Sequence, residues 1–309
     1  MLISRKNAKT ATAAAIMLAD MFINKEPGYE GYIVANSREQ AKIAFKFISG
    51  YARSLDPKHK YVKIYRDYIT YSKTNGTIKV LAADSNTLDG YNPVSYVVDE
   101  FHAAKDDSLY NVLRSGQAMR KNPLAITITS AGFLLNGYPC YEQVKSYERM
   151  LQGEYNDDTI FALLYQLDDH DDWKNPSTWK KAIPSLGDIV NVRYMQERVD
   201  EASHDPRKEV DVKTKNFNMW CTSSKIWLNN ERFNECCTKL DLNQLTGNYC
   251  YCGVDLSATR DLTAIAFLWG PDPYREYYPE KFLITFNIWI PRIALEESDN
   301  KALYKFFVD

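Results

Sequence analysis

Lys9 and Thr10 are the residues near the start of the chain whose types and spacing best suit phosphate chemistry. They end the segment SRKNAKT (residues 4–10) and precede an alanine-rich run. In a phosphate-binding loop (P-loop, or Walker A motif), backbone N–H groups at a helix N-terminus surround the phosphates, a lysine reaches the β- and γ-phosphates, and Ser or Thr binds Mg²⁺. Lys9 and Thr10 fit the last two roles, but the glycines of the full motif would fall at Ile3 and Ala8. On this segment alone, a basic helix N-terminus is the favoured interpretation.

Asp99 and Glu100 form a second candidate group, at the end of the apolar run in YVVDE. Ligands bind at the carboxyl ends of strands in open α/β sheets. There Asp99 would hold Mg²⁺, directly or through water, and Glu100 would orient and activate the attacking water, as in a Walker B motif. Two acids after a strand can equally form a solvated turn. The two motifs lie about 90 residues apart with one βα unit and a hairpin between them, and together they favour ATP hydrolysis over coincidence.

Thr129 and Ser130 end a third apolar strand, in PLAITITSAG. At the same sheet edge they could detect the γ-phosphate through its water and relay its loss to neighbouring loops. A turn of small residues explains this stretch equally well. Arg5, Arg114 and Arg120 are candidates to neutralise charge in the transition state. Most arginines are solvated or ion-paired, so none is singled out by the pattern alone.

The elements that must position these residues are those of an α/β fold. Helix-like stretches alternate with short apolar runs, which is typical of βαβ units and a mostly parallel sheet. Alternating residues on either side of Asn75 and Gly76 predict a hairpin. The predicted elements are a helix over residues 10–24, a strand over 31–36, a helix over 37–55, the hairpin over 67–84, and strands over 94–100 and 123–132.

The composition changes after Gly153. Residues 157–179 contain a strand-like core and an acidic, proline-containing loop, and residues 189–220 predict one or two charged helices. Beyond residue 248, two apolar strands around a polar turn and a third apolar run predict the start of an antiparallel or mixed sheet. We therefore predict three parts: a first domain over 1–222, a linker over 223–247 and a partial second domain over 248–309.

Composition excludes several classes of protein. The 309 residues suffice for about two domains. The 38 basic and 40 acidic residues leave a net charge of −2, so no global positive field indicates a nucleic-acid binder, and any DNA contact must come from local patches. The densest basic and aromatic stretch, residues 46–68, is interpreted as a helix with a solvated side and a basic connecting loop. The six cysteines show no zinc-like spacing and favour reduced thiols, and no apolar run reaches the ~20 residues of a membrane span.

The sequence resembles a known family in several segments taken in order. These are RKNAKT, ANSREQAK, LAADSNTLDGYNPVSYVVDEFHAAKDDSLYNVLRSGQAMRKNPLAITITSAG, KTKNFNMW and GVDLSATRDLTAI. They are similar to the large terminase subunit of tailed double-stranded DNA phages, in the HK97-like branch. Members of that branch tolerate a deviant phosphate loop, so the missing glycines no longer argue against nucleotide binding.

The resemblance implies roles for individual residues of an ASCE-type ATPase. Asp99 and Glu100 match its second acidic motif, and residues 129–132 match a coupling motif. Arg5 matches an arginine that senses or stabilises the γ-phosphate, which ranks it above Arg114 and Arg120. The residues implied to bind ATP and Mg²⁺ at the loop are Ser4, Arg5, Lys6, Asn7, Ala8, Lys9 and Thr10.

The resemblance also implies a ribonuclease-H-like nuclease after the ATPase. Asp255 in YCGVDLS matches its first acidic residue. Two-metal cleavage needs several carboxylates around two ions, Mg²⁺ or Mn²⁺, and Asp255 could supply one ligand. Asp261, six positions on, is interpreted as structural. Without the family match, a turn aspartate would be the favoured interpretation of Asp255.

The resemblance further implies a cytoplasmic DNA-packaging motor in a bacterial host. Its partners would be double-stranded DNA, a small terminase subunit and the procapsid portal, on which the large subunit forms a homo-oligomeric ring. Family members carry a strand and an adenine-contacting segment before the loop, and further nuclease acids after Asp255, so we expect a chain truncated at both ends and deficient in nuclease activity. A helicase-like P-loop ATPase and an inactive prophage fragment remain as alternatives.

Overall fold

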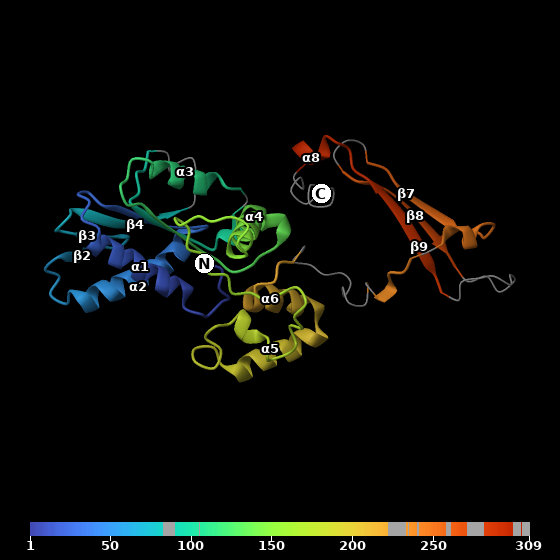
Figure 1. The fold of residues 1–309 in the computed structure, drawn as a ribbon, viewed down its shortest axis with the longest axis horizontal. Helices are drawn as coiled ribbons and strands as arrows, with labels where there is room; N and C mark the ends of the chain where they lie inside the picture. Colours follow the sequence, from blue (N-terminus) through green and yellow to red (C-terminus); the bar gives the residue numbers. More distant parts are fainter. Residues whose placement is uncertain are drawn as a thin grey trace. The chain divides into compact units, whose positions relative to one another are not determined.

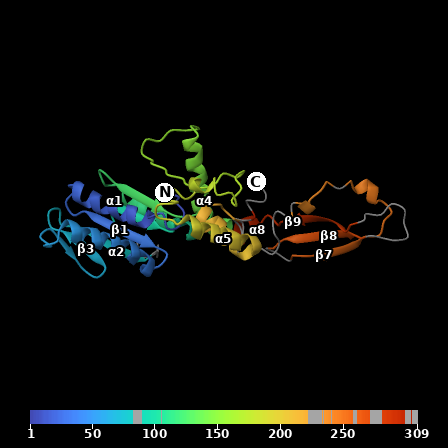
Figure 2. The same cartoon turned by 90° about the horizontal axis from the view of Figure 1, so that it is seen from below.

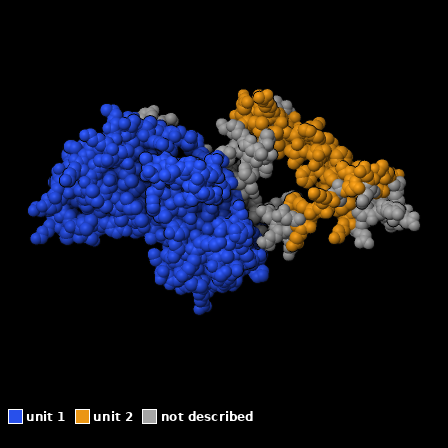
Figure 3. Space-filling model, in the orientation of Figure 1, with its two compact units in different colours: residues 1–227 blue, residues 228–309 orange. Residues whose placement is uncertain are grey.

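The computed structural model describes residues 1–82, 90–104, 106–221, 233, 235–239, 241–257, 261–270, 281–298 and 304. The chain divides into two compact units, Met1–Trp227 and Leu228–Asp309 (Figure 3). No helix among the described residues combines the length and apolarity that crossing a membrane requires.

The first unit is built on a six-stranded sheet whose inner strands are parallel, as predicted. Strands β1, β4, β5 and β6 run parallel, and β2 and β3 add an antiparallel edge. The hairpin turns at Asn75, whose φ of 53° explains the Asn-Gly pair. In spatial order the strands are β2 (Val62–Ile64), β3 (Tyr68–Tyr71), β4 (Gly76–Ala82), β1 (Glu30–Ala35), β5 (Ser95–Asp99) and β6 (Leu124–Ile128).

Two features of this sheet differ from the sequence expectation. Strand β2 lies where a connecting loop was predicted, because Val62 is buried against the sheet's helical cover while Lys63 faces outward. The predicted hairpin extends to residue 84, and its last two residues lie outside the described part of the chain.

Helices cover both faces of the sheet (Figure 1). Helices α1 (Lys9–Ile23) and α2 (Arg38–Leu55) pack side by side on one face (Figure 2). The other face carries α3 (Ser108–Gly116) and α4 (Leu134–Leu151), which bury apolar residues of β1 and β5. The α2 helix begins where Ser37 Oγ accepts a hydrogen bond from the backbone N–H of Gln40, an N-cap that the sequence SREQ favours.

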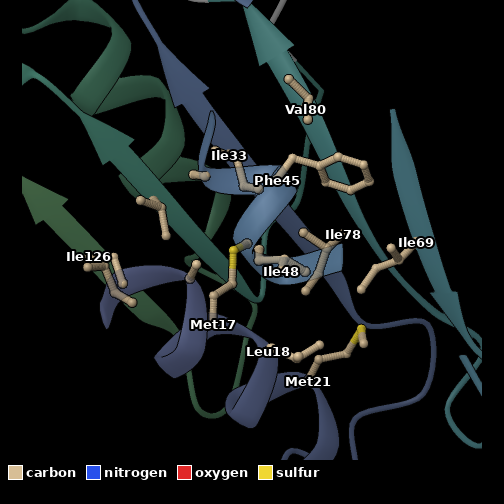
Figure 4. Close-up of a cluster of buried hydrophobic side chains, with 14 of the residues drawn as sticks. Met17, Leu18, Met21, Ile33, Phe45, Ile48, Ile69, Ile78, Val80 and Ile126 are labelled. Carbon is tan, nitrogen blue, oxygen red and sulfur yellow. The ribbon is translucent and has the colours of Figure 1, made fainter. Parts of the chain in front are cut away.

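A core of buried apolar side chains lies between α1, α2 and the sheet (Figure 4). It fixes the position of residues 4–10, because α1 begins at Lys9. Met17 is fully buried there. Gly31 of β1 allows this close packing, since a Cβ atom at that position would lie 2.8 Å from Met17 Cε.

We expect Met17→Ala to lower the free energy of unfolding by about 2–5 kcal/mol, because it removes buried atoms and leaves a cavity. Urea unfolding followed by circular dichroism measures the change. Ile16→Ala is the matched control, since Ile16 is the neighbouring residue and is 41% exposed. Equal destabilisation by the two substitutions would contradict the assigned packing of α1.

Residues 1–3 add a short extended segment to the sheet beside β6. Leu2 forms parallel bridges with Thr129 and with Leu164. Backbone hydrogen bonds join Ile3 N to Thr129 O at 3.0 Å and Leu2 N to Leu163 O at 2.8 Å. The segment before the loop is therefore held from both sides, and β6 separates it from β5.

The remainder of the first unit forms a second core. Helices α5 (Val192–His204) and α6 (Pro206–Phe217) account for the charged helical stretch of the sequence. They pack against Trp173 and the fully buried Trp179. This subregion supports the phosphate loop from outside the sheet.

The second unit contains a three-stranded antiparallel sheet, as predicted. Its order is β7 (Tyr251–Asp255), β8 (Thr263–Trp269) and β9 (Leu283–Trp289), followed by the short helix α8 (Ala294–Glu297). Residues 258–260, in the predicted polar turn, and about half of the predicted linker 223–247, including residues 223–232, lie outside the described residues. The three-part division of the chain stays a prediction.

Candidate active site

The segment of residues 4–10 forms a loop that ends on the first turn of α1. Ala8 has φ of 58° and Lys6 has φ of 70°, both in the left-handed region. A glycine is typical of the Ala8 position because it adopts this conformation without a steric cost, and other residues lose about 1–3 kcal/mol. The loop therefore adopts, at an alanine, a backbone conformation typical of glycine.

Contacts from the second core hold this strained loop. Ser4 Oγ donates to Ala182 O at 2.9 Å, and Arg5 N donates to Lys215 O at 2.9 Å. The Asn7 side chain links the loop to the second core, since its amide NH₂ donates to Ser4 Oγ at 2.8 Å and its Oδ1 accepts from Ser185 N at 3.1 Å. The Ser4 and Asn7 side chains are thus turned into the protein, so these two residues could contact phosphate only through the backbone.

Lys9 and Thr10 meet the acids of β5 directly. Lys9, only 7% exposed, places Nζ 3.5 Å from Glu100 Oε1. Thr10 Oγ1 donates to Asp99 Oδ2 at 3.3 Å. The two motifs, 89 residues apart at this contact, converge at the carboxyl end of the sheet, as expected for residues that bind ligands in open α/β folds.

Asp99 has the features of a cation ligand. Its Oδ1 atom is buried without a hydrogen-bond partner among the described residues. Burial, and then the charge of Glu100, raise the pKa of Asp99 to about 6. A divalent ion would compensate both the unpartnered oxygen and the disfavoured charge, and Mg²⁺ prefers oxygen ligands of this kind. The donor set of Thr10 and Asp99 therefore fits Mg²⁺.

Glu100 is kept ionised although it is largely buried. Burial alone would raise its pKa, but a hydrogen bond from His102 and the charges of Lys9, His102 and Arg5 lower the pKa to about 2. Its backbone has φ of 57°, a strained conformation held by the bond from Glu100 N to Ile128 O at 3.0 Å. A carboxylate charged at neutral pH at the edge of a phosphate site could orient and activate water.

His102 connects Glu100 to the end of β6, a role that sequence inspection missed. Its Nδ1 lies 3.1 Å from Glu100 Oε2, and its backbone N–H donates to Thr129 Oγ1 at 3.0 Å. Thr129 Oγ1 in turn donates to Ser130 O at 2.8 Å. The only sequence signal for this role is that His102 follows Glu100 by two residues. That spacing does not predict the contact, because a 3₁₀ turn, η2 (Phe101–Ala103), brings His102 back to the site.

The three candidate arginines lie in different places. Arg5 is exposed on the loop of residues 4–10, and its charge contributes to lowering the pKa of Glu100. Arg120 instead pairs with Glu26 at 2.8 Å and bonds to Asn92 O, and it serves the fold. Arg114 lies on the exposed side of α3. The geometry thus brings together Lys9, Thr10, Asp99 and Glu100, with Thr129 and Ser130 joined through His102, and Arg5 lies on the same loop as Lys9.

In the second unit, Asp255 lies at the exposed end of β7. Within the described residues, it belongs to no group of three side chains that could hold a metal ion. Asp261 accepts hydrogen bonds from Leu262 N at 2.8 Å and from the Tyr304 hydroxyl at 3.1 Å, which is a structural role.

In the first unit, the described residues Asp168, His170 and Asp171 lie close enough together to hold a metal ion. There the Lys181 ammonium already pairs with both aspartates.

Comparisons with known proteins agree with this geometry. The sequence matches the family model for the ATPase domain of the terminase large subunit over residues 1–149, and the model for its endonuclease domain over residues 154–296. The second match begins well before the second compact unit, which starts at Leu228.

Individual relatives show how much of such a protein the chain covers. Protein YmfN of Escherichia coli strain K12 is 31% identical over 66% of this chain and 44% of its own length. The terminase large subunit of Lactococcus phage p2 is 24% identical over 86% of this chain and 49% of its own length. The crystal structure of the HK97 bacteriophage large terminase superposes with a TM-score of 0.62 and 25% identity, covering 100% of this chain and 63% of that one. The chain spans about half the length of the curated relatives it matches.

Proposed function

This chain belongs to the terminase large-subunit family, and from that premise we propose that it is an ATP-hydrolysing motor that translocates double-stranded DNA into procapsids. We propose also that it cleaves concatemeric DNA with a metal-dependent nuclease. The observation that carries the motor assignment is the meeting of Lys9 and Thr10, at the start of α1, with Asp99 and Glu100, at the end of β5.

The phosphate loop would bind the triphosphate through backbone N–H groups and one lysine. The left-handed turns at Lys6 and Ala8, together with the N-terminus of α1, provide the backbone of an anion site. Lys9 Nζ, already held at the edge of this loop by Glu100, would contact the β- and γ-phosphates. Thr10 and Asp99 would hold Mg²⁺, which when bound neutralises charge on the phosphates.

Glu100 would act on the attacking water, since it stays ionised at neutral pH. Its carboxylate would orient the water and accept its proton. Arg5 supplies positive charge beside Glu100 and would stabilise the γ-phosphate as its bond breaks. Thr129 and Ser130, through His102, would couple the state of Glu100 to the end of β6.

Asp255 is proposed as one carboxylate ligand of the nuclease metal ions, Mg²⁺ or Mn²⁺. The support is the endonuclease family match that includes Asp255 and its place on the first strand of the second sheet. The proposed partners are double-stranded DNA, a small terminase subunit and the procapsid portal, on which copies of this chain would form a homo-oligomeric ring. The proposed place of action is the cytoplasm of a bacterial host.

A packaging assay tests the proposed function as a whole. Portal-bearing procapsids, small subunit, linear DNA and this chain are mixed with ATP, and DNA protected from added DNase is measured. We expect protection that depends on ATP and on Glu100. Hydrolysis of ATP that depends on Glu100 without any protected DNA would support an ATPase unrelated to packaging.

We expect His102→Ala to lower kcat for ATP about tenfold with a smaller change in KM, because Glu100 loses the group that orients it. His102→Asn keeps a donor near the Nδ1 position and should recover part of the loss. Steady-state phosphate release over a range of ATP concentrations separates the two parameters. An unchanged kcat for His102→Ala would show that His102 does not position Glu100.

A further inference from the structure

The outer strands of the first sheet present one face that no helix of the described part of the chain covers. Helices α1 and α2 bury Val62, Ile69 and Ile78 on the opposite face. The core beneath α3 and α4 takes its strand residues from β1, β5 and Leu81 of β4, and includes no residue of β2 or β3. The uncovered face belongs to β2, β3 and β4, which lie at one end of the sheet (Figure 1).

Strand register shows which residues share this outward face. Lys63 pairs with Thr70, and Thr70 pairs with Thr77. Tyr68 pairs with Lys79 on one side. On the other side, its carbonyl oxygen accepts a hydrogen bond from the backbone N–H of Tyr65. Because alternate residues of a strand point to the same side, cations, hydroxyls and tyrosine rings form a continuous outer-strand face. We define the outer-strand face by Lys60, Tyr61, Lys63, Tyr65, Tyr68, Thr70, Lys73, Thr77 and Lys79.

The charge of the outer-strand face is positive and unneutralised. Its four lysines form no ion pair within 4 Å among the described residues, and Arg66 in the adjoining turn forms none either. Of the nearby acids, Asp67 pairs with Arg38 at 3.1 Å, and Asp56 lies at the edge of the face, where it accepts the backbone N–H groups of Lys60, Tyr61 and Val62 and pairs with none of the four lysine ammonium groups. This is the local cationic patch that the overall charge of −2 conceals.

Tyrosine rings hold these cations in place. The ammonium groups of Lys60 and Lys73 lie 5.0 Å and 4.7 Å from the centre of the Tyr61 ring. Tyr65 and Tyr68 stack on each other with centroids 4.4 Å apart, so their rings are already partnered. Because these two rings stack on each other, the groups of this face that remain to contact a ligand are hydroxyl groups and lysine ammonium groups. Such groups contact phosphates and not unstacked bases.

We propose that the outer-strand face binds the phosphate backbone of double-stranded DNA. The inference rests on the proposed function, in which duplex DNA is the substrate, and it assigns the contact surface. Lys60, Lys63 and Lys73 would each contact a phosphate, and the threonine hydroxyls of β3 and β4 would add neutral hydrogen bonds. Contacts of this kind are insensitive to base sequence and weaken with salt.

The test is fluorescence anisotropy of a labelled duplex with the full chain and a triple variant, Lys60→Gln, Lys63→Gln and Lys73→Gln. We expect Kd to rise at least about tenfold at 0.1 M salt, and the slope of log K against log salt to fall by about 2–3, because three phosphate contacts are lost. The matched control carries Lys25→Gln, Lys121→Gln and Lys180→Gln, three exposed lysines outside this face with the same change in net charge. The control should leave Kd within about twofold.

ATP hydrolysis without DNA should be equal in both triple variants, which shows that the fold and the ATP site are intact. Equal weakening of DNA binding by the two variants would overturn the inference and leave the proposed function standing. Absence of duplex binding by the unsubstituted chain would overturn the DNA substrate itself, and the inference with it. Binding of a single-stranded oligonucleotide tenfold tighter than the duplex would contradict the assignment to the duplex backbone. Such a preference would indicate that bases stack on the tyrosine rings, since stacking contributes about 1–3 kcal/mol per base.

Discussion

ATP hydrolysis is expected to fall at least about 100-fold when Glu100 is replaced with glutamine, while ATP binding is retained, because general-base catalysis contributes roughly 10²–10⁴-fold. Glutamine keeps the size of the side chain and can still accept a hydrogen bond from His102. It cannot accept a proton from water, and it lacks the charge that the surroundings of Glu100 stabilise so strongly that its pKa falls to about 2. The substitution thus removes the proposed base and leaves the phosphate loop in place.

The measurement is phosphate release at saturating ATP, with ATP affinity determined on the same protein by calorimetry. Glu39→Gln is the matched control, because its side chain is 83% exposed on α2 and its loss should leave hydrolysis unchanged. Hydrolysis by Glu100→Gln at the rate of the control would mean that another residue activates the water.

ATP affinity is expected to fall about 100-fold when Lys9 is replaced with alanine, a loss of roughly 3 kcal/mol. Lys9 is a buried cation at the end of the loop, and its ammonium lies 3.5 Å from the carboxylate of Glu100. Without it, the triphosphate would meet Asp99 and Glu100 with no neighbouring lysine to offset their charge. A charge-assisted contact is lost and a repulsion is gained, so the effect should exceed that of a surface lysine.

Titration with ATP in the presence of Mg²⁺, followed by calorimetry, measures this change. Lys25→Ala removes an exposed lysine elsewhere and should leave the dissociation constant unaltered. Thermal unfolding checks that Lys9→Ala is folded, since the change leaves a partly buried carboxylate without its ion pair. An unchanged affinity in a folded Lys9→Ala protein would exclude the loop as the triphosphate site.

Local sequence patterns predicted most of the framework around this site. The apolar run in SYVVD, the Asn75-Gly76 turn and the helix predicted over residues 37–55 each depend on a few neighbouring residues, and each appears in the structure. The convergence of Lys9 with Glu100 followed from a general property of parallel sheets, which gather the ends of strands at one edge.

The supports of the site could not be predicted from such patterns. Asn7 is fastened by Ser185, which lies 178 residues away, and no local periodicity encodes that contact. His102 reaches Glu100 only because a short 3₁₀ turn redirects the chain. Strand β2 was missed because three residues show too little alternation to distinguish a strand from a loop.

The most direct test of the ATP site is a crystal structure of this chain with Mg²⁺ and a non-hydrolysable ATP analogue. We expect the triphosphate on the backbone of residues 5–10, with Lys9 Nζ on its outer phosphates and Mg²⁺ held by Thr10 and Asp99. We also expect Glu100 to face the γ-phosphate. A nucleotide bound elsewhere, with Lys9 still paired to Glu100 and the loop empty at saturating concentration, would contradict this assignment.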